Sequence, residues 1–341
     1  MNPTKILIIQ TAFLGDVILA TALIEKLHSY FPQSRIDFVV RKGNETLLHE
    51  HPLLTHLHVW NKQQTKLKNL YQLVETIRKE KYDLVINVQR FLSSGILAGF
   101  SGAKHRIGFQ NNPISFLFTQ TYSHEIGNGV HEITRNQQLI ASITDEIPSK
   151  PKLYPTAQHE ATVKSYQTQP YICLAPSSVW FTKQYPMDKW AELVGQLPST
   201  LKIYLLGSLS DKDMCNRIME KAGLQFNFSP ANRVENLCGK LSLLESAALM
   251  RSATMNYVND SAPLHIASAV NAPVCAIFCS TIPAFGFTPL SDTSFIVENT
   301  NNLSCRPCGL HGHKKCPQNH FACGNEIETG RLVQILTQNS H

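Results

Sequence analysis

Short apolar runs rich in β-branched residues recur along this chain, and each is followed by a segment with helical spacing of its apolar residues. The first run, at 5–9, reads Lys-Ile-Leu-Ile-Ile, and it leads into Val17, Ile18, Leu23 and Leu27. Such runs are typical of strands that are buried on both faces of a parallel sheet, with helices covering those faces. The alternation therefore predicts an α/β fold built on parallel sheets.

The alternation occurs twice, with a proline-rich segment between the two series. Prolines stand at 148, 151, 155 and 170 among Ser, Thr and Gln, a composition typical of a linker. A chain of 341 residues is also longer than one hydrophobic core usually serves. We predict Rossmann-like domains at 1–150 and 171–325, a linker at 151–170 and a C-terminal helix at 326–341. Paired domains of this kind usually hold their ligand in the cleft between them.

Composition narrows the class of partner. The chain has 31 Lys and Arg against 25 Asp and Glu, a net charge of +6, and these residues are spread along the sequence. A spread, mild positive charge favours anionic small molecules or a phosphate-bearing surface over nucleic acid. The apolar stretch 6–24 is interrupted by Gln10, Thr11, Gly15 and Asp16, so it does not predict a membrane helix. We expect a cytoplasmic protein, at most peripheral at the inner face of a membrane.

Several common enzyme motifs are absent from the sequence. No G-x-G-x-x-G follows the first strand, and no G-x-x-x-x-G-K-[ST] occurs anywhere. The nucleophile elbow G-x-S-x-G and the zinc motif H-E-x-x-H are missing too. These absences argue against a standard dinucleotide dehydrogenase, a P-loop NTPase, an α/β-hydrolase and a zinc protease.

The first candidate for chemistry is Asp16, which with Gly15 follows the first predicted strand. Spacing alone favours a structural role, because Asp is a preferred helix N-cap and its charge suits the helix dipole. A carboxylate at the carboxyl end of a strand is also placed to act as a general base. Both roles are compatible in one residue.

Two further segments follow strands of the second half. Residues 259–265, Asn-Asp-Ser-Ala-Pro-Leu-His, open a helix whose free amides form a ready anion site. The alternative is a merely capped helix with a packed His265, and spacing does not decide between them. The loop at 176–186 offers the hydroxyls of Ser177 and Ser178 and the ammonium of Lys183 for phosphate oxygens. A single loop lysine is more often only a solvated charge.

In this order, the three segments resemble the ADP-heptose:lipopolysaccharide heptosyltransferase family, which is glycosyltransferase family 9 and has the GT-B fold. The resemblance rests on Gly15-Asp16, on Lys183-Gln184-Tyr185-Pro186 and on Asp260-Ser261-Ala262-Pro263-Leu264-His265. His131 and Arg135 match a His-x-x-x-Arg helix start of many members, and 278–281 stands at a family turn. Departures include Ala262 for a glycine and Ser177 for another, which bear on the donor more than on the fold.

The resemblance implies an inverting, metal-independent transfer of heptose from ADP-heptose to a lipopolysaccharide inner-core acceptor. Asp16 is then the general base, and the diphosphate is bound by the side chains and amides of Ser177, Ser178, Lys183, Asp260, Ser261, Ala262, Leu264 and His265. On the acceptor side we assign Gly15, Gln89, Arg90 and His131. No cofactor is expected for catalysis.

Four of the nine cysteines fall between 305 and 323, namely Cys305, Cys308, Cys316 and Cys323. A Cys-x2-Cys pair followed by two more thiols has the ligand type and spacing of a tetrahedral structural zinc site. Reduced thiols and one or two disulfides remain alternatives. The cluster lies in the predicted second domain.

Two other functions stay open at this point. One is a GT-B transferase or epimerase that uses another nucleotide-sugar, such as a UDP-sugar. The other is a catalytically inactive, zinc-containing binding protein on the same scaffold. The presence of both Asp16 and Lys183 argues against the inactive scaffold.

Overall fold

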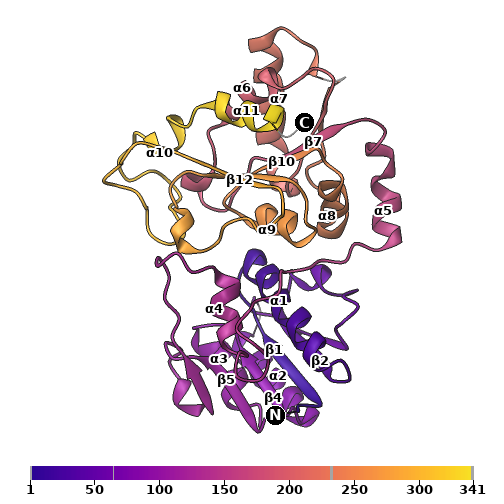
Figure 1. Cartoon of the computed structure of the whole chain (residues 1–341), viewed down its shortest axis with the longest axis vertical. Coiled ribbons are helices and arrows are strands. Elements are labelled where there is room, and N and C mark those ends of the chain that lie inside the picture. The colour runs from indigo at the N-terminus through magenta and orange to yellow at the C-terminus, as the bar shows by residue number, and fades with distance from the viewer. Residues whose placement is uncertain (1, 64, 231–232, 339–341) are drawn as a thin grey trace. The chain divides into compact units, whose positions relative to one another are not determined.

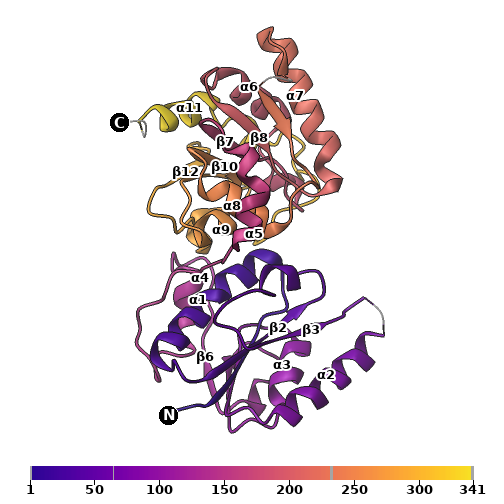
Figure 2. The ribbon, with the colours of Figure 1, turned by 90° about the vertical axis from the view of Figure 1, so that its right-hand side faces the viewer.

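The chain forms two compact units, residues 1–154 and 155–341. The computed structural model describes residues 2–63, 65–230 and 233–338. Each unit is one parallel sheet with helices on both faces (Figures 1 and 2). The α/β prediction is confirmed. Within the described ranges, no helix combines the length and apolar character needed to cross a membrane.

The first unit holds a six-stranded parallel sheet in the order β3-β2-β1-β4-β5-β6. Its strands are β1 (Lys5–Ile9), β2 (Arg35–Arg41), β3 (His56–Trp60), β4 (Leu84–Asn87), β5 (His105–Phe109) and β6 (Gln120–Tyr122). Its helices are α1 (Leu14–Tyr30), α2 (Lys66–Glu80), α3 (Leu92–Gly99) and α4 (Glu132–Gln138). The core between sheet and helices is apolar, with Leu7, Ile9, Trp60, Ile77 and Val85 among its buried members.

The second unit repeats this plan in the order β12-β11-β10-β7-β8-β9. Its strands are β7 (Tyr171–Ala175), β8 (Lys202–Leu205), β9 (Val234–Asn236), β10 (Met255–Asn259), β11 (Val274–Phe278) and β12 (Ser294–Glu298). Its helices are α5 (Ala157–Val163), α6 (Met187–Gln196), α7 (Lys212–Phe226), α8 (Leu243–Arg251), α9 (Ala262–Ala269), α10 (Ala322–Asn325) and α11 (Thr329–Gln338).

Each sheet has one point where the strand order reverses, between β1 and β4 in the first unit and between β7 and β10 in the second. The loops that leave these neighbouring strands run to opposite faces of the sheet, so they open a crevice at the carboxyl ends of the strands. Gly15-Asp16 follows β1 and Gln89-Arg90 follows β4. Lys183 follows β7 and Asp260 follows β10. The topology thus places the sequence candidates at the switch points.

Two segments differ from the sequence expectation. Residues 151–170, expected to be a linker, contain α5, whose Glu160 forms an ion pair with Arg251 of α8. The backbone N–H of Thr156 donates to Nδ1 of His159 at 3.0 Å, and this local cap lets a short polar helix form between prolines. The C-terminal helix α11 covers Thr329–Gln338 only, and residues 339–341 of the expected helix lie outside the described residues.

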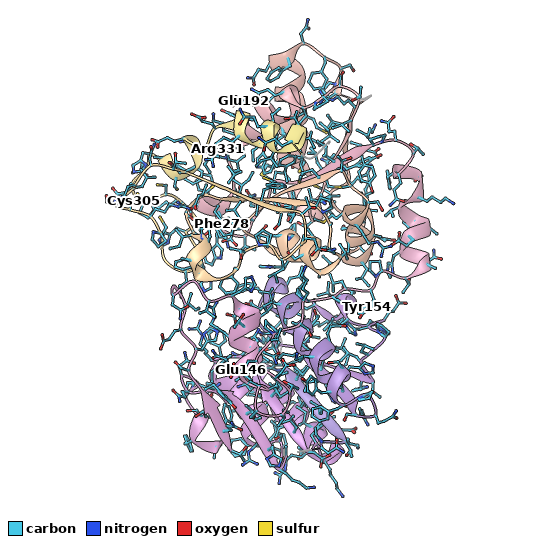
Figure 3. All side chains as sticks on the ribbon, in the orientation of Figure 1. Glu146, Tyr154, Glu192, Phe278, Cys305 and Arg331 are labelled. Carbon is cyan, nitrogen blue, oxygen red and sulfur yellow. The ribbon has the colours of Figure 1, made fainter. Side chains whose placement is uncertain are left out.

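Helix α11 is tied to both α6 and the sheet. Thr329 donates to Oε2 of Glu192 on α6 at 2.8 Å, and Arg331 donates to the carbonyl of Glu298 at the end of β12 at 3.0 Å. Figure 3 labels Glu192 and Arg331 on these two neighbouring helices. The C-terminal helix is therefore an integral part of the second unit.

Candidate active site

In the first unit, the loop after β1 is fixed by side chains from three neighbouring strand ends. Both the backbone N–H and the hydroxyl of Thr11 donate to Oε1 of Gln89, at 3.0 and 2.7 Å. Lys62 donates to the Thr11 carbonyl at 2.7 Å, and Asn44 donates to the Ala12 carbonyl at 3.2 Å. This loop is thus held rigid just before the helix that carries Asp16.

Asp16 is the third residue of α1, not its N-cap as spacing suggested, because the helix begins at Leu14 with Phe13 at the cap. Its Oδ2 accepts a hydrogen bond from the backbone N–H of Phe13 at 3.1 Å. The carboxylate therefore caps the helix from inside and adds a favourable charge to the dipole. Asp16 and Gly15 are both half-buried. That exposure leaves the carboxylate within reach of a substrate.

The other expected acceptor-side residues have structural roles that the sequence did not reveal. Gln89 is buried and braces Thr11, while its Nε2 is a buried donor without a partner among the described residues. Arg90 is half-buried beside it in the sequence. His131 is the N-cap of α4, and its Nδ1 accepts from the backbone N–H of Ile133 at 3.2 Å. A capping histidine is oriented by the helix that it begins.

A buried charge network follows His131. Glu132 accepts hydrogen bonds from Arg135 at 2.7 Å and from His124 at 3.1 Å. Burial opposes the charged form of Glu132, but the hydrogen bond and charge of His124 and the charge of Arg135 outweigh it, and its pKa is lowered. Arg135, matched to a family position by sequence, thus stabilises α4 through Glu132.

In the second unit, an ion pair joins the two loops at the switch point. Nζ of Lys183 lies 2.7 Å from Oδ2 of Asp260, and the hydroxyl of Thr281 donates to the same oxygen at 2.6 Å. The side chains of Lys183 and Asp260 are only 14% and 9% exposed. An ammonium has three N–H donors, and Asp260 uses one of them. Lys183 therefore keeps donors for an anionic ligand while its position is fixed.

Asn259, which the sequence did not single out as a site residue, connects these loops. Its Nδ2 donates to the carbonyl of Pro176 at 2.8 Å, and its Oδ1 accepts from the backbone N–H of Tyr185 at 2.9 Å. The sequence did contain a signal for this role, namely a polar residue at the end of a buried strand. A buried side-chain amide needs hydrogen-bond partners for both its N–H groups and its oxygen. Asn259 sets the positions of both ends of the loop that carries Lys183.

The loop hydroxyls and His265 have local partners. The hydroxyl of Ser178 accepts from the N–H of Trp180 at 3.4 Å, and the carbonyl of Ser178 accepts from Gln184 at 2.6 Å. Ser177 is half-buried next to it. His265 is buried in α9, with its ring centroid 6.5 Å from that of Phe287. The loop is thus shaped by its own hydrogen bonds.

The start of α9 offers fewer amides than the sequence suggested. Pro263 has no N–H, and the N–H of Leu264 donates to the Ser261 carbonyl at 3.0 Å. The N–H of Leu264 is thus used within the turn, and its assignment to the donor site stays a prediction. The N–H groups of Ser261 and Ala262 make no hydrogen bond among the described residues, and they lie next to Asp260 in the chain. Together with Lys183 they form a compact set of donors for an anion.

The cysteine-rich segment is bonded directly to the loop that carries Lys183. The backbone N–H of His313 donates to the hydroxyl of Thr182 at 2.7 Å, and the hydroxyl of Ser280 donates to that hydroxyl at 3.0 Å. The N–H of Thr182 in turn donates to the His313 carbonyl at 3.1 Å. Within the described residues, no three His, Cys, Asp or Glu side chains stand close enough to form a closed metal-ligand set.

Comparison with known proteins identifies the family of this chain. The family model of glycosyltransferase family 9 (heptosyltransferase) matches residues 70–318. This chain belongs to glycosyltransferase family 9. It is therefore a glycosyltransferase, and family 9 is the heptosyltransferase family.

Family 9 relatives match over most of their length. Lipopolysaccharide heptosyltransferase 3 of Escherichia coli is 26% identical over 79% of this chain and 82% of its own. Lipooligosaccharide heptosyltransferase 2 of Haemophilus influenzae is 26% identical over 86% of this chain and 88% of its own. The solved structure of Escherichia coli ADP-heptose lps heptosyltransferase II superposes with a TM-score of 0.78 at 20% identity, over 99% of this chain and 100% of its own. The GT-B fold is thus confirmed.

Proposed function

We propose that this family 9 enzyme transfers heptose from ADP-heptose to the inner core of a lipopolysaccharide, with inversion at the anomeric carbon and without a metal cofactor. Two of the relatives act in lipopolysaccharide or lipooligosaccharide synthesis by name, and the solved relative is named for ADP-heptose. The observation that carries the proposal is the Lys183–Asp260 pair beside the start of α9. That arrangement suits a diphosphate-linked donor.

The donor side rests on positive charge fixed before the donor arrives. Lys183 presents its remaining N–H groups, and Ser261 and Ala262 present backbone amides at the positive end of the α9 dipole. As the bond from the anomeric carbon to the diphosphate breaks, negative charge grows on the departing phosphate oxygens. Donors that are already in place stabilise this charge without reorganisation. These residues would supply the charge compensation that a divalent metal supplies in other transferases.

The acceptor side rests on Asp16. In the proposed step, the carboxylate takes the proton of the attacking acceptor hydroxyl, and that oxygen forms a bond to the anomeric carbon on the face opposite the diphosphate. The rigid β1–α1 loop holds the base, because Thr11 and Ala12 are fixed by Gln89, Lys62 and Asn44. General-base catalysis of this kind contributes about 100- to 10,000-fold to a rate.

Basic side chains near this loop support a phosphate-bearing acceptor. Lys62 bonds to the Thr11 carbonyl, and the guanidinium of Arg41 lies 5.2 Å from the ring centre of Phe13. Burial, together with the charges of Arg41 and Lys66, lowers the pKa of Lys62 to about 8. An anionic ligand would relieve the repulsion among these cations. Because the acceptor is a lipid, transfer would take place at a membrane surface.

Donor identity is tested by thermal shift with ADP-heptose, ADP-glucose, UDP-glucose and UDP-N-acetylglucosamine. We expect ADP-heptose and ADP to raise the melting temperature and the UDP-sugars to leave it unchanged. A larger increase of the melting temperature with a UDP-sugar would contradict this proposal and would favour a transferase or epimerase that uses another nucleotide-sugar. Repeating the transfer assay with EDTA tests metal independence, which predicts unchanged turnover.

A further inference from the structure

The cysteine-rich segment 303–324 lines, together with Thr182, a cavity of about 290 Å³. All four clustered cysteines line it, together with His313 and His320. The other five cysteines are buried elsewhere in the second unit, and two of them, Cys215 and Cys238, lie with their sulfurs 3.3 Å apart. Figure 3 places Cys305 at the periphery of the second unit, in the segment before α10.

The first two cysteines form a folded turn. The thiol of Cys308 donates to the carbonyl of Cys305 at 3.3 Å, so its side chain bends back over the turn. Gly309 follows with φ +66°, a conformation that a glycine adopts without cost. The backbone N–H of Cys308 donates to the Ser280 carbonyl at 2.9 Å, and Arg306 donates to the Thr281 carbonyl at 2.7 Å. This turn is therefore anchored to the end of β11.

The other two cysteines stand on a second anchored turn. The N–H of Asn319 donates to the Cys316 carbonyl at 3.2 Å, and Asn325 donates to the His320 carbonyl at 2.9 Å. Cys323 lies in α10 and is 4% exposed within the apolar core of the second unit. The two turns thus bring two thiols each to the wall of one cavity, which supplies the ligand type and number of a four-thiolate metal site.

We propose that Cys305, Cys308, Cys316 and Cys323 bind one structural zinc ion. In the structure, the four thiols line the cavity but do not form a closed ligand set. Zinc–sulfur bonds of about 2.3 Å would draw the two turns together. Four thiolates around Zn²⁺ carry a net charge of −2, which the exposed Lys314 and Lys315 of the same segment can offset, while Arg306 is already paired with Glu298. Arg306 also has a buried Nε without a partner among the described residues, and a thiolate is the kind of acceptor that it lacks.

His320 is a neighbour of the site and not a ligand through its Nε2. Its Nδ1 accepts the backbone N–H of Ala322 at 2.9 Å, so the proton of the neutral ring lies on Nε2. Nε2 stands 3.9 Å from the sulfur of Cys305, where it would donate to the thiolate. Metal-bound thiolates are commonly oriented by such outer hydrogen bonds. The ligand set is therefore four cysteines and not three cysteines with one histidine.

Metal analysis of the whole chain, purified without an affinity tag or chelator, tests the proposal. We expect about one zinc per chain in the natural protein, in Cys173→Ala and in His320→Gln, and a loss of most of the zinc in Cys308→Ser and Cys316→Ser. Cys173 is a buried thiol of β7 and serves as the matched control.

If a serine variant fails to fold, measurements on the natural protein still test whether the thiols bind zinc. Titration with a mercurial should release the zinc as the thiols react, since the thiolates hold the metal. Iron in place of zinc, zinc far below one per chain, or fewer than nine free thiols after denaturation without reductant would each overturn the proposal. Zinc retained by Cys308→Ser but lost from His320→Gln would overturn the ligand set.

Discussion

Lys183 and Asp260 form an ion pair of 2.7 Å between the loops that leave β7 and β10. The pair is mostly buried, and Thr281 completes the hydrogen bonding of Asp260. A lysine held in this way loses little side-chain freedom when it contacts a phosphate, because its freedom has been lost on folding. The ion pair thus fixes the position of the Lys183 ammonium before a ligand binds.

Replacing Lys183 with methionine should weaken ADP binding by about tenfold or more, since a hydrogen bond to a charged group contributes about 1.5–3 kcal/mol. The change should also lower the free energy of unfolding by about 3 kcal/mol, because Asp260 is left as a buried charge without its partner. Calorimetric titration and urea unfolding measure both effects. Lys189→Met is the control, since its ion pair with Glu192 is more exposed. Equal ADP affinity in the two variants would remove Lys183 from the donor site.

Two glycines of the cysteine-rich segment allow a matched comparison. Gly312 has φ +75°, and a Cβ there would lie 2.8 Å from the Thr182 hydroxyl and 3.0 Å from that of Ser280. Gly309 has φ +66°, with nothing within 4 Å of such a Cβ. Alanine at either position costs about 1 kcal/mol of backbone strain. Only Gly312→Ala should also displace the Lys183 loop.

The readout of this comparison is ADP affinity. We expect Gly312→Ala to weaken ADP binding severalfold, and Gly309→Ala to leave it unchanged while lowering the melting temperature slightly. If both variants bind ADP like the natural protein, the cysteine-rich segment does not position the donor loop.

Much of this fold follows from local sequence pattern. The strand at 5–9 matches its predicted bounds, because buried β-branched runs have few alternatives in an α/β chain. Helix α5 was missed because its sequence, Ala157–Val163, is short and polar and is stabilised by its cap and by Arg251. Short polar helices of this kind depend on tertiary contacts that the sequence does not display.

Several residues of the candidate site could be predicted from the sequence, but their hydrogen-bond partners could not. Lys183 and Asp260 were selected because each follows a predicted strand. Their contact requires β7 and β10 to be neighbours in the sheet, and the order of strands is set by the crossover connections of the fold. Asn259, Thr182 and Lys62 were missed because their roles lie in hydrogen bonds to the backbone of distant loops. Leu264 was selected as an amide donor, and the sequence did not show that its N–H also donates to the Ser261 carbonyl in a short turn.

Lowering the pH should destabilise the first unit already at pH values above those at which carboxylates become protonated. Burial is the main cause that lowers the pKa of both His51 and His58 to about 4, so both rings are neutral in the folded protein. In the unfolded chain their pKa is the ordinary 6.5, so as the pH falls from 6.5 to 4 the unfolded state takes up protons first. The free energy of unfolding should therefore fall across this window by a few kcal/mol.

Hydrogen exchange of the β1 and β4 amides at pH 7 and 4.5 measures this loss in the first unit. His58 serves as the reporter, with burial as the main cause of its lowered pKa and smaller opposing contributions from the charges of Asp37 and Glu80. His58→Gln preserves a donor for the hydroxyl of Tyr82, which lies 2.8 Å from Nε2 of His58. That variant should show a shallower pH dependence. An unchanged slope would mean that His58 is charged in the folded protein.

The proposed mechanism centres on Asp16 as the general base. Asp16→Asn keeps an oxygen for the N–H of Phe13 and removes the carboxylate that would accept the proton. Asp213→Asn removes a first-turn carboxylate from α7 and controls for the loss of the helix-dipole contribution, about 0.5 kcal/mol. Both variants should therefore fold and bind ADP like the natural protein.

The most direct measurement is turnover of ADP-heptose with lipopolysaccharide inner cores that carry no heptose, one heptose or two, followed by mass spectrometry of the product for the natural protein and both variants. We predict that Asp16→Asn lowers kcat by about 1,000-fold while ADP affinity stays within about threefold, and that Asp213→Asn is unaffected. Near-normal turnover by Asp16→Asn, or no heptose transfer by the natural protein, would contradict the account.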